Sequence, residues 1–369
     1  MIDPIKILQR SWHILWNYRA LWVFGLFLAL ATGTSYNSGS NNNMQWRDSR
    51  NGTQTPPPDL QELFRYITRE LHTVLQQGIP DANITGPALT TFLWIVGVFV
   101  VLMFLVGIVM AVARYVSETA VIRMVDEYEN TGTKLTIREG FQLGWSRTAW
   151  RLFLINLIVT LPIIILVVVL LIAGVVTLIS AADGTGDFTT VSIVGLASLA
   201  FTSICTIIVL SIFLSLVRHF FWRVAVLENA SVGESLRRGF GMVRENWKNV
   251  GLMWIVMVGL GIAWVVASLI AFILMIPVVI VTALIAIVTV AVPFLLLFGL
   301  FSTFLTGPLP WIAAGLFVLP PFSLIAFSPW LLLGSWKSVF TSTVWTLTYR
   351  EIKALPAIAP QFEPVTVEG

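Results

Sequence analysis

The sequence predicts an all-α integral membrane protein, a helical bundle built from three pseudo-repeats. Two observations lead to this prediction. The chain is 57% hydrophobic and only 11% charged, and its mean hydropathy is +0.87, whereas soluble domains carry about a quarter charged residues. In addition, a short charged segment that begins with a helix cap and continues into an apolar span occurs three times, which indicates an internal repeat.

The repeated segment is an amphipathic elbow helix that leads into a transmembrane hairpin. Its copies start at Asp3, Thr136 and Ser231. Glu139 and Glu234 follow the second and third starts three residues later, as in a capping box, and a proline follows Asp3 at the first helical position. In each copy a small residue lies eight positions after the cap, an aromatic residue comes next, and basic residues follow. These elbow positions are Ser11 and Trp12, Gly144 and Trp145, and Gly239 and Phe240. The small residues predict close packing of each elbow against the bundle.

The repeats together form one expected polytopic membrane domain, residues 1–354, followed by a flexible tail at 355–369. Repeat 1 covers 3–130, and its outer loop 34–88 carries an amphipathic helix at 59–77, where apolar residues recur with a period of 3.6. Repeat 2 covers 136–230. Repeat 3 covers 231–354 and contains an apolar insert at 277–310.

Six apolar segments are long enough, or nearly so, to cross a bilayer. They are 20–31, Leu89–Ala113, Leu152–Ile179, Val191–Val217, Val250–Ile276 and Trp311–Gly334, the last bent at Pro320 and Pro321. The first is as short as a signal-peptide core and ends in a sequence like a cleavage site. We favour a retained helix, because the helix before it matches two later copies that cannot be signal peptides.

The insert and the segment after the last span are expected to lie partly in or on the membrane. Residues 277–291 and 294–305 are each too short to cross, and Pro293 separates them, which favours a re-entrant hairpin. Two further crossings, eight in all, are the alternative. Ser335–Lys353 mixes hydroxyl, aromatic and basic residues and is expected to be an interfacial helix.

The placement of basic residues predicts the orientation. Segments 114–151 and 218–248 carry six Lys and Arg each, and the turn 180–190 carries none. By the positive-inside rule the elbows and both termini are cytoplasmic. The net charge of +3 is too small to indicate a nucleic-acid partner.

No catalytic, cofactor or metal-binding motif is present in the sequence. It has one cysteine and three widely separated histidines, and the six spans contain no charged residue. We therefore expect a non-catalytic membrane scaffold or lipid-interacting module, whose partners are the bilayer, anionic lipids and a protein of unknown identity. The candidate contacts to anionic lipid are Arg147, Arg151, Arg237, Arg238, Arg244 and Lys248.

Two other function classes remain open at this point. A transporter or flippase for an apolar or lipid-like substrate needs broken helices around a site, for which the proline-rich residues 277–310 are the candidate. An enzyme is the third class. It would need Glu118, His219 and Glu228 to face one cytoplasmic pocket.

Three stretches resemble a family of uncharacterised bacterial multi-pass proteins: IDPIKILQRSWHILWNYRALWVFGLFLAL, ASVGESLRRGFGMVRENW and FTSTVWTLTYREI. More distantly, the layout is similar to the membrane domain fused to glycerophosphodiester phosphodiesterases. The resemblance implies a helical bundle with cytoplasmic elbows in the inner (plasma) membrane of a bacterial cell. It does not imply the phosphodiesterase reaction, because that chemistry belongs to a separate soluble domain. It assigns no functional residues.

Overall fold

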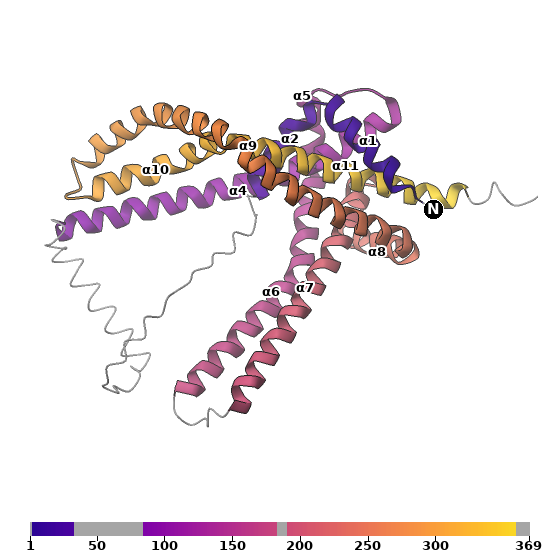
Figure 1. Ribbon diagram of the computed structural model, residues 1–369, viewed down its shortest axis with the longest axis horizontal. Helices are drawn as coiled ribbons and strands as arrows, with labels where there is room; N and C mark the ends of the chain where they lie inside the picture. The colour runs from indigo at the N-terminus through magenta and orange to yellow at the C-terminus, as the bar shows by residue number, and fades with distance from the viewer. Residues whose placement is uncertain (1, 33–83, 183–189, 359–369) are drawn as a thin grey trace, which may run out of the picture. The chain divides into compact units, whose positions relative to one another are not determined.

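The computed structural model describes residues 2–32, 84–182 and 190–358, and these form helices joined by short connections (Figure 1). The helices are α1 (Pro4–Asn17), α2 (Ala20–Thr32), α4 (Gly86–Thr131), α5 (Ile137–Gly144), α6 (Arg147–Ala182), α7 (Thr190–Leu227), α8 (Val232–Glu245), α9 (Trp247–Phe301), α10 (Leu309–Ala326) and α11 (Ser328–Ile358). The described residues contain no β-strand, which confirms the all-α class. The helix predicted at 59–77 lies outside the described residues.

The three predicted elbow helices exist as α1, α5 and α8, and each begins at its predicted cap. Asp3 accepts hydrogen bonds from the backbone N–H groups of the first turn of α1. Thr136 and Glu139 form the complete capping box of α5. Ser231 accepts from the backbone N–H of Glu234, whose carboxylate pairs with an arginine one turn further along α8. These local bonds satisfy N–H groups that a helix start otherwise leaves open.

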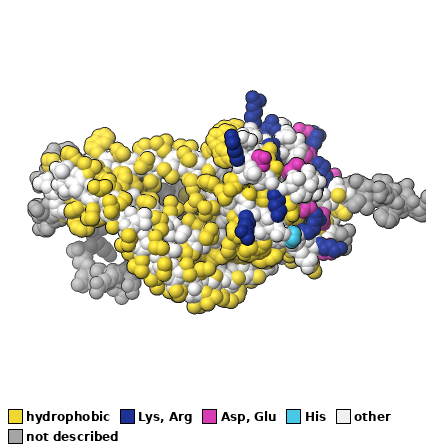
Figure 2. All heavy atoms as spheres, turned by 90° about the horizontal axis from the view of Figure 1, so that it is seen from above, with side chains coloured by type: hydrophobic (Ala, Val, Ile, Leu, Met, Phe, Trp, Pro, Cys, Tyr) yellow, Lys and Arg dark blue, Asp and Glu magenta, His cyan; other side chains and the backbone are white. Residues whose placement is uncertain are grey.

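The described chain groups into two compact units. Unit 1 comprises Met1–Thr32, Met110–Leu269 and Leu333–Gly369, and unit 2 comprises Gly33–Val109 and Ile270–Leu332. The described residues of unit 2 contain no Asp, Glu, Lys, Arg or His, so all charged side chains of the described chain belong to unit 1. On the face that Figure 2 shows, the charged side chains gather in one region. The division of the chain into three repeats stays a prediction.

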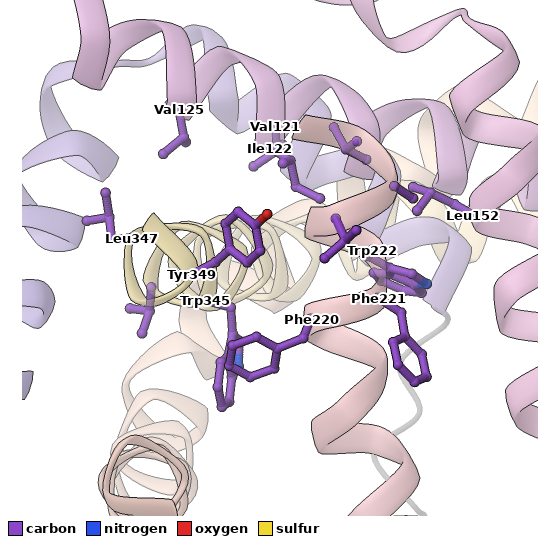
Figure 3. Packing of buried hydrophobic residues seen from close by; sticks show 14 of the residues in the cluster. Val121, Ile122, Val125, Leu152, Phe220, Phe221, Trp222, Trp345, Leu347 and Tyr349 are labelled. Carbon is purple, nitrogen blue, oxygen red and sulfur yellow. The ribbon is translucent and has the colours of Figure 1, made fainter. Parts of the chain in front are cut away.

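The core of unit 1 forms where α4, α6, α7 and α11 meet. Figure 3 shows Val121 and Ile122 of α4 and Phe220 of α7 around Tyr349 and Trp345 of α11. All five are less than 5% exposed. Beyond this core, α6 and α7 run side by side as a hairpin (Figure 1).

The middle of helix α11 is buried on all sides, which contradicts the expectation that Ser335–Lys353 is an interfacial helix. Every residue from Ser342 to Tyr349 is buried. The hydroxyls of Thr346 and Thr348 donate to the carbonyl oxygens of Ser342 and Val344, one turn earlier in the same helix, at 2.8 Å each. This local bonding lets a Thr-rich helix enter a core. Helix α11 also continues to Ile358, so residues 355–358 of the predicted tail are helical.

Helix α2 is built into unit 1 beside α11. Leu21, Phe24 and Leu28 belong to the buried core. The Ser335 hydroxyl of α11 donates to the carbonyl oxygen of Trp22 at 2.8 Å. Helices α1 and α2 meet at an angle of 101°.

Unit 2 packs the first part of α4 and the second part of α9 with α10. The rings of Phe99 (α4) and Phe317 (α10) lie 5.1 Å apart, and those of Phe298 (α9) and Trp311 (α10) lie 4.6 Å apart. The Thr282 hydroxyl of α9 donates to the carbonyl oxygen at the end of α10 at 2.9 Å. Aromatic ring contacts and a partly buried hydrogen bond therefore join these three segments.

The predicted re-entrant hairpin is wrong, because α9 is one helix through Pro277 and Pro293. A helix of 55 residues is roughly 80 Å long, far more than the ~30 Å hydrocarbon core. The predicted span Trp311–Gly334 is divided at Phe327 between α10 and α11, and Pro320 and Pro321 stand inside α10. Proline lacks one N–H and bends a helix without ending it where neighbouring segments support the backbone.

Five described helices, namely α4, α6, α7, α9 and α10, are long and apolar enough to cross a membrane, and the bent pair α1 and α2 would add a sixth. The structure thus agrees with an integral membrane protein.

Candidate functional site

The small residues of the three elbows lie in close contact with the bundle. Ser11 has no exposed surface, and Gly144 and Gly239 are buried. A Cβ atom on Gly144 would lie 2.5 Å from the carbonyl oxygen of Val116, and one on Gly239 would lie 2.6 Å from Cδ1 of Phe221. Because real Cβ atoms do not approach so closely, these contacts require glycine.

The aromatic residue that follows each small residue points outward. Trp12 is 53% exposed, Trp145 63% and Phe240 48%. On α1 it shares one face with Ile5 and Trp16, and on α5 with Ile137 and Phe141, all of them exposed. Each elbow helix therefore buries one face in the bundle and presents large apolar side chains on another.

The six predicted lipid contacts divide into two groups. Arg238 pairs with Glu228 and Glu234, and Arg151 donates to the carbonyl oxygens of Asn229 and Ala230. These two arginines therefore bind other groups of the protein itself. The other four are exposed, and no ion pair joins them to the part of the chain that the structure describes: Arg147, Arg237, Arg244 and Lys248.

The most buried charge in unit 1 is the guanidinium of Arg223 on α7. Arg223 is 1% exposed. Its Nη1 donates to the carbonyl oxygen of His219 at 2.9 Å, and its Nη2 donates to the carbonyl oxygen of Ser342 on α11 at 3.0 Å. Nη2 also lies 3.7 Å from Oε1 of Glu118 on α4, which accepts a hydrogen bond of 2.8 Å from the Ser342 hydroxyl. We call Glu118, His219, Arg223 and Ser342 the Arg223 cluster.

The Arg223 cluster joins three helices by charge and hydrogen bonds. An arginine can only donate, so Nδ1 of His219, 3.3 Å from Nη1 of Arg223, is the acceptor of that contact. The imidazole stacks on Trp345 with ring centroids 5.0 Å apart. Removing one partner of a buried ion pair typically costs about 3–5 kcal/mol, since the other charge stays buried and unpaired. The cluster therefore holds α4, α7 and α11 in one arrangement.

A second cluster lies at the end of α7 around Glu228. Its carboxylate accepts hydrogen bonds from Tyr349 and Lys353 of α11, at 2.7 Å each, and from Arg238 of α8 at 3.1 Å. Burial alone would raise the pKa of Glu228, but these three hydrogen bonds hold the pKa below its usual range. The pKa of Tyr349 is raised, first by burial and then by its bond to this carboxylate. Glu228 is therefore ionised at neutral pH and ties two helices to α7.

A third contact fixes the turn between α7 and α8. Asn229 has a positive φ of 51°, a conformation that asparagine tolerates better than most residues. Its side-chain oxygen accepts from Arg123 at 3.0 Å, and Arg123 also donates to the carbonyl oxygen of Leu143 at 3.0 Å. The backbone oxygen of Asn229 accepts from Arg151 at 2.6 Å. Arginines of two helices thus hold the turn from which the third elbow starts.

The residues named for an enzyme do not share one set of contacts. Glu118 and His219 both contact Arg223, while Glu228 is bonded to Tyr349, Lys353 and Arg238. The Arg223 cluster was missed in the sequence because charges at span ends are ordinary. One signal was available: His219 and Arg223 are four residues apart and so share a helix face directly after a long apolar run.

Comparison with known proteins gives one match. The sequence model of a family of unknown function (DUF7544) matches residues 14–344. No curated protein and no solved structure matches the chain.

Proposed function

The chain belongs to the family of unknown function DUF7544, and from its geometry we propose that it is a non-catalytic membrane scaffold whose elbow helices bind anionic lipid at the cytoplasmic surface of the inner membrane. One observation carries the proposal. The elbow helices bury their small residues in the bundle and expose aromatic side chains. Beside the second and third elbows, Arg147, Arg237, Arg244 and Lys248 have no ion pair among the described residues.

The exposed aromatic faces support an interfacial position. Trp12 and Trp16 of α1, and Phe141 and Trp145 of α5, would be costly in contact with bulk water. Tryptophan rings are favoured at the headgroup level, where one part of the ring is apolar and the N–H can meet a polar group. An elbow helix with such a face would lie in the plane of the interface.

The basic residues support a preference for anionic lipid. Arg237 and Arg244 lie on the exposed face of α8 with Phe240, and Lys248 follows at the start of α9. A Lys or Arg near an anionic membrane surface gains about 1 kcal/mol, which is about a fivefold change in affinity. The gain falls with salt, because surface charges are screened.

The transporter or flippase alternative depended on broken helices within residues 277–310. Helix α9 is continuous through Pro277 and Pro293, which leaves that alternative without the feature that motivated it. The scaffold proposal instead uses the buried small residue and the exposed aromatic residue, which occur on all three elbows.

The experiment compares lipid binding to the full-length protein purified in detergent. Native mass spectrometry would count bound phosphatidylglycerol and phosphatidylcholine for the wild type and for the triple variant R237Q/R244Q/K248Q. We expect the wild type to prefer phosphatidylglycerol, and the variant to lose that preference by about fivefold per charge removed.

The control is R237K/R244K, which keeps both charges and should bind as the wild type does. Raising the salt concentration should weaken the preference of the wild type in parallel. Equal binding of the two lipids by the wild type, at low salt, would refute the lipid-binding proposal.

A further inference from the structure

We propose that Arg114 of α4 and Arg218 of α7 form a binding site for a phosphate group at the cytoplasmic boundary of the membrane, in addition to the elbow surface. Each is the first charged residue after a long apolar run, Arg114 after Leu89–Ala113 and Arg218 after Val191–Val217. Such residues lie at the level of the lipid headgroups.

Contacts to one turn of α6 bring the two arginines to the same place. Tyr115, next to Arg114, packs its ring edge-on against Phe153 of α6, with centroids 5.7 Å apart. Nη1 of Arg218 donates to Oδ1 of Asn156 at 3.1 Å. Phe153 and Asn156 are three residues apart on α6 and so lie on one face of it.

The local charges do not balance within the described residues. Arg114 lies one turn before Glu118 on α4, and Arg218 lies on α7 five residues before Arg223. The carboxylate of Glu118 is already engaged by Arg223 and by the Ser342 hydroxyl. No carboxylate of the described residues lies within ion-pair distance of Arg218. Two positive charges held together at a low-dielectric boundary need a counter-charge.

Unused donors point to the kind of ligand. Nε of Arg218 and Nε1 of Trp222 are both buried and have no acceptor among the described residues. The guanidinium of Arg218 lies over the ring of Trp222 at 5.2 Å, and that of Arg114 over the ring of Tyr115 at 6.0 Å. Buried donors in folded proteins nearly always have acceptors. A phosphate oxygen suits this place, because guanidinium groups bind phosphate with two parallel hydrogen bonds.

The ligand is therefore a phosphate group, carried either by a lipid headgroup or by a small soluble phosphate. The site differs from the elbow surface in what it selects. The elbows respond to the net charge of a lipid, whereas this site responds to the phosphate itself. It should accept phosphatidylcholine and phosphatidylglycerol alike and reject diacylglycerol, which has no phosphate.

The test is native mass spectrometry of the full chain in detergent, titrated separately with phosphatidylcholine and diacylglycerol. We expect the wild type to retain phosphatidylcholine and R218Q to bind it at least about tenfold more weakly, as for the loss of a hydrogen bond to a charged group. R218K keeps the positive charge but lacks the two parallel N–H donors of a guanidinium, so it should recover part of the affinity. R237Q/R244Q, on the elbow surface, should bind phosphatidylcholine as the wild type does.

Competition identifies the source of the phosphate. If inorganic phosphate or glycerol 3-phosphate displaces phosphatidylcholine, the site takes a soluble phosphate as well; if neither does, it takes a lipid headgroup. Should R218Q fail to fold, R114Q replaces it, because the described contact of Arg114 is with an aromatic ring. Equal retention of diacylglycerol, or unchanged phosphatidylcholine binding by a folded variant, would overturn the proposal and leave the elbow proposal standing.

Discussion

Replacing Gly239 by alanine tests whether the third elbow is held by close packing. Alanine is favoured over glycine inside a helix by about 1 kcal/mol, so helix propensity alone predicts stabilisation. A Cβ atom at this position would meet Cδ1 of Phe221 at 2.6 Å and the backbone nitrogen of the same residue at 3.3 Å. Carbon atoms are optimally about 3.5–4.0 Å apart. The ring would thus have to move by about 1 Å, although Phe221 is only 7% exposed.

Overpacking a buried site costs about 1–3 kcal/mol, which offsets or exceeds the gain in helix propensity. We expect G239A to lower the free energy of unfolding by up to about 2 kcal/mol and G239L to lower it further. The same helix offers a matched control. Gly241 has no atom within 4 Å of its would-be Cβ, so G241A should stabilise the protein by about 0.5–1 kcal/mol.

The assay is unfolding of the purified protein in mild detergent by added sodium dodecyl sulfate, followed by far-UV circular dichroism. The decisive quantity is the difference in the free energy of unfolding between G239A and G241A, expected to be about 1–3 kcal/mol. If G239A proves as stable as G241A, the elbow does not rest on Phe221 as described, and the packing argument fails.

Three further predictions use the same unfolding assay. G144A should destabilise the protein by about 1–3 kcal/mol, because its Cβ would lie 2.5 Å from a backbone oxygen of α4. Rotating a side chain cannot relieve a clash with backbone, and an unchanged free energy of unfolding would contradict this prediction. Arg223→Met should cost about 3–5 kcal/mol, and adding Glu118→Leu should recover part of it, whereas additive losses would argue against a coupled pair. The depressed pKa of Glu228 contributes stability that is present above the ordinary glutamate pKa and is lost as the pH falls through the lower folded-state pKa. Glu228→Gln should therefore make the free energy of unfolding depend less on pH in this acidic range. The same pH dependence in the variant and the wild type would contradict this.

The sequence by itself determined the features that depend on neighbouring residues. The membrane class followed from composition, and the starts of the elbow helices followed from caps whose hydrogen bonds span only three residues, as at Asp3, Thr136 and Ser231. The spacing from cap to small residue indicated which side of each elbow packs inward, since helical period and side-chain size act locally.

Only the tertiary structure decided what α11 and the span-end charges do. Ser342 and Glu118 are 224 residues apart in the chain, and Arg223 and Ser342 are 119 apart. No local pattern shows that such residues meet, and a Thr-rich helix looks like a surface helix until its neighbours are known. The continuity of α9 was missed for the same reason, because whether a proline ends a helix or only bends it depends on the segments packed around it. Local chemistry set the elements, and the burial of charge between distant helices was set by their packing.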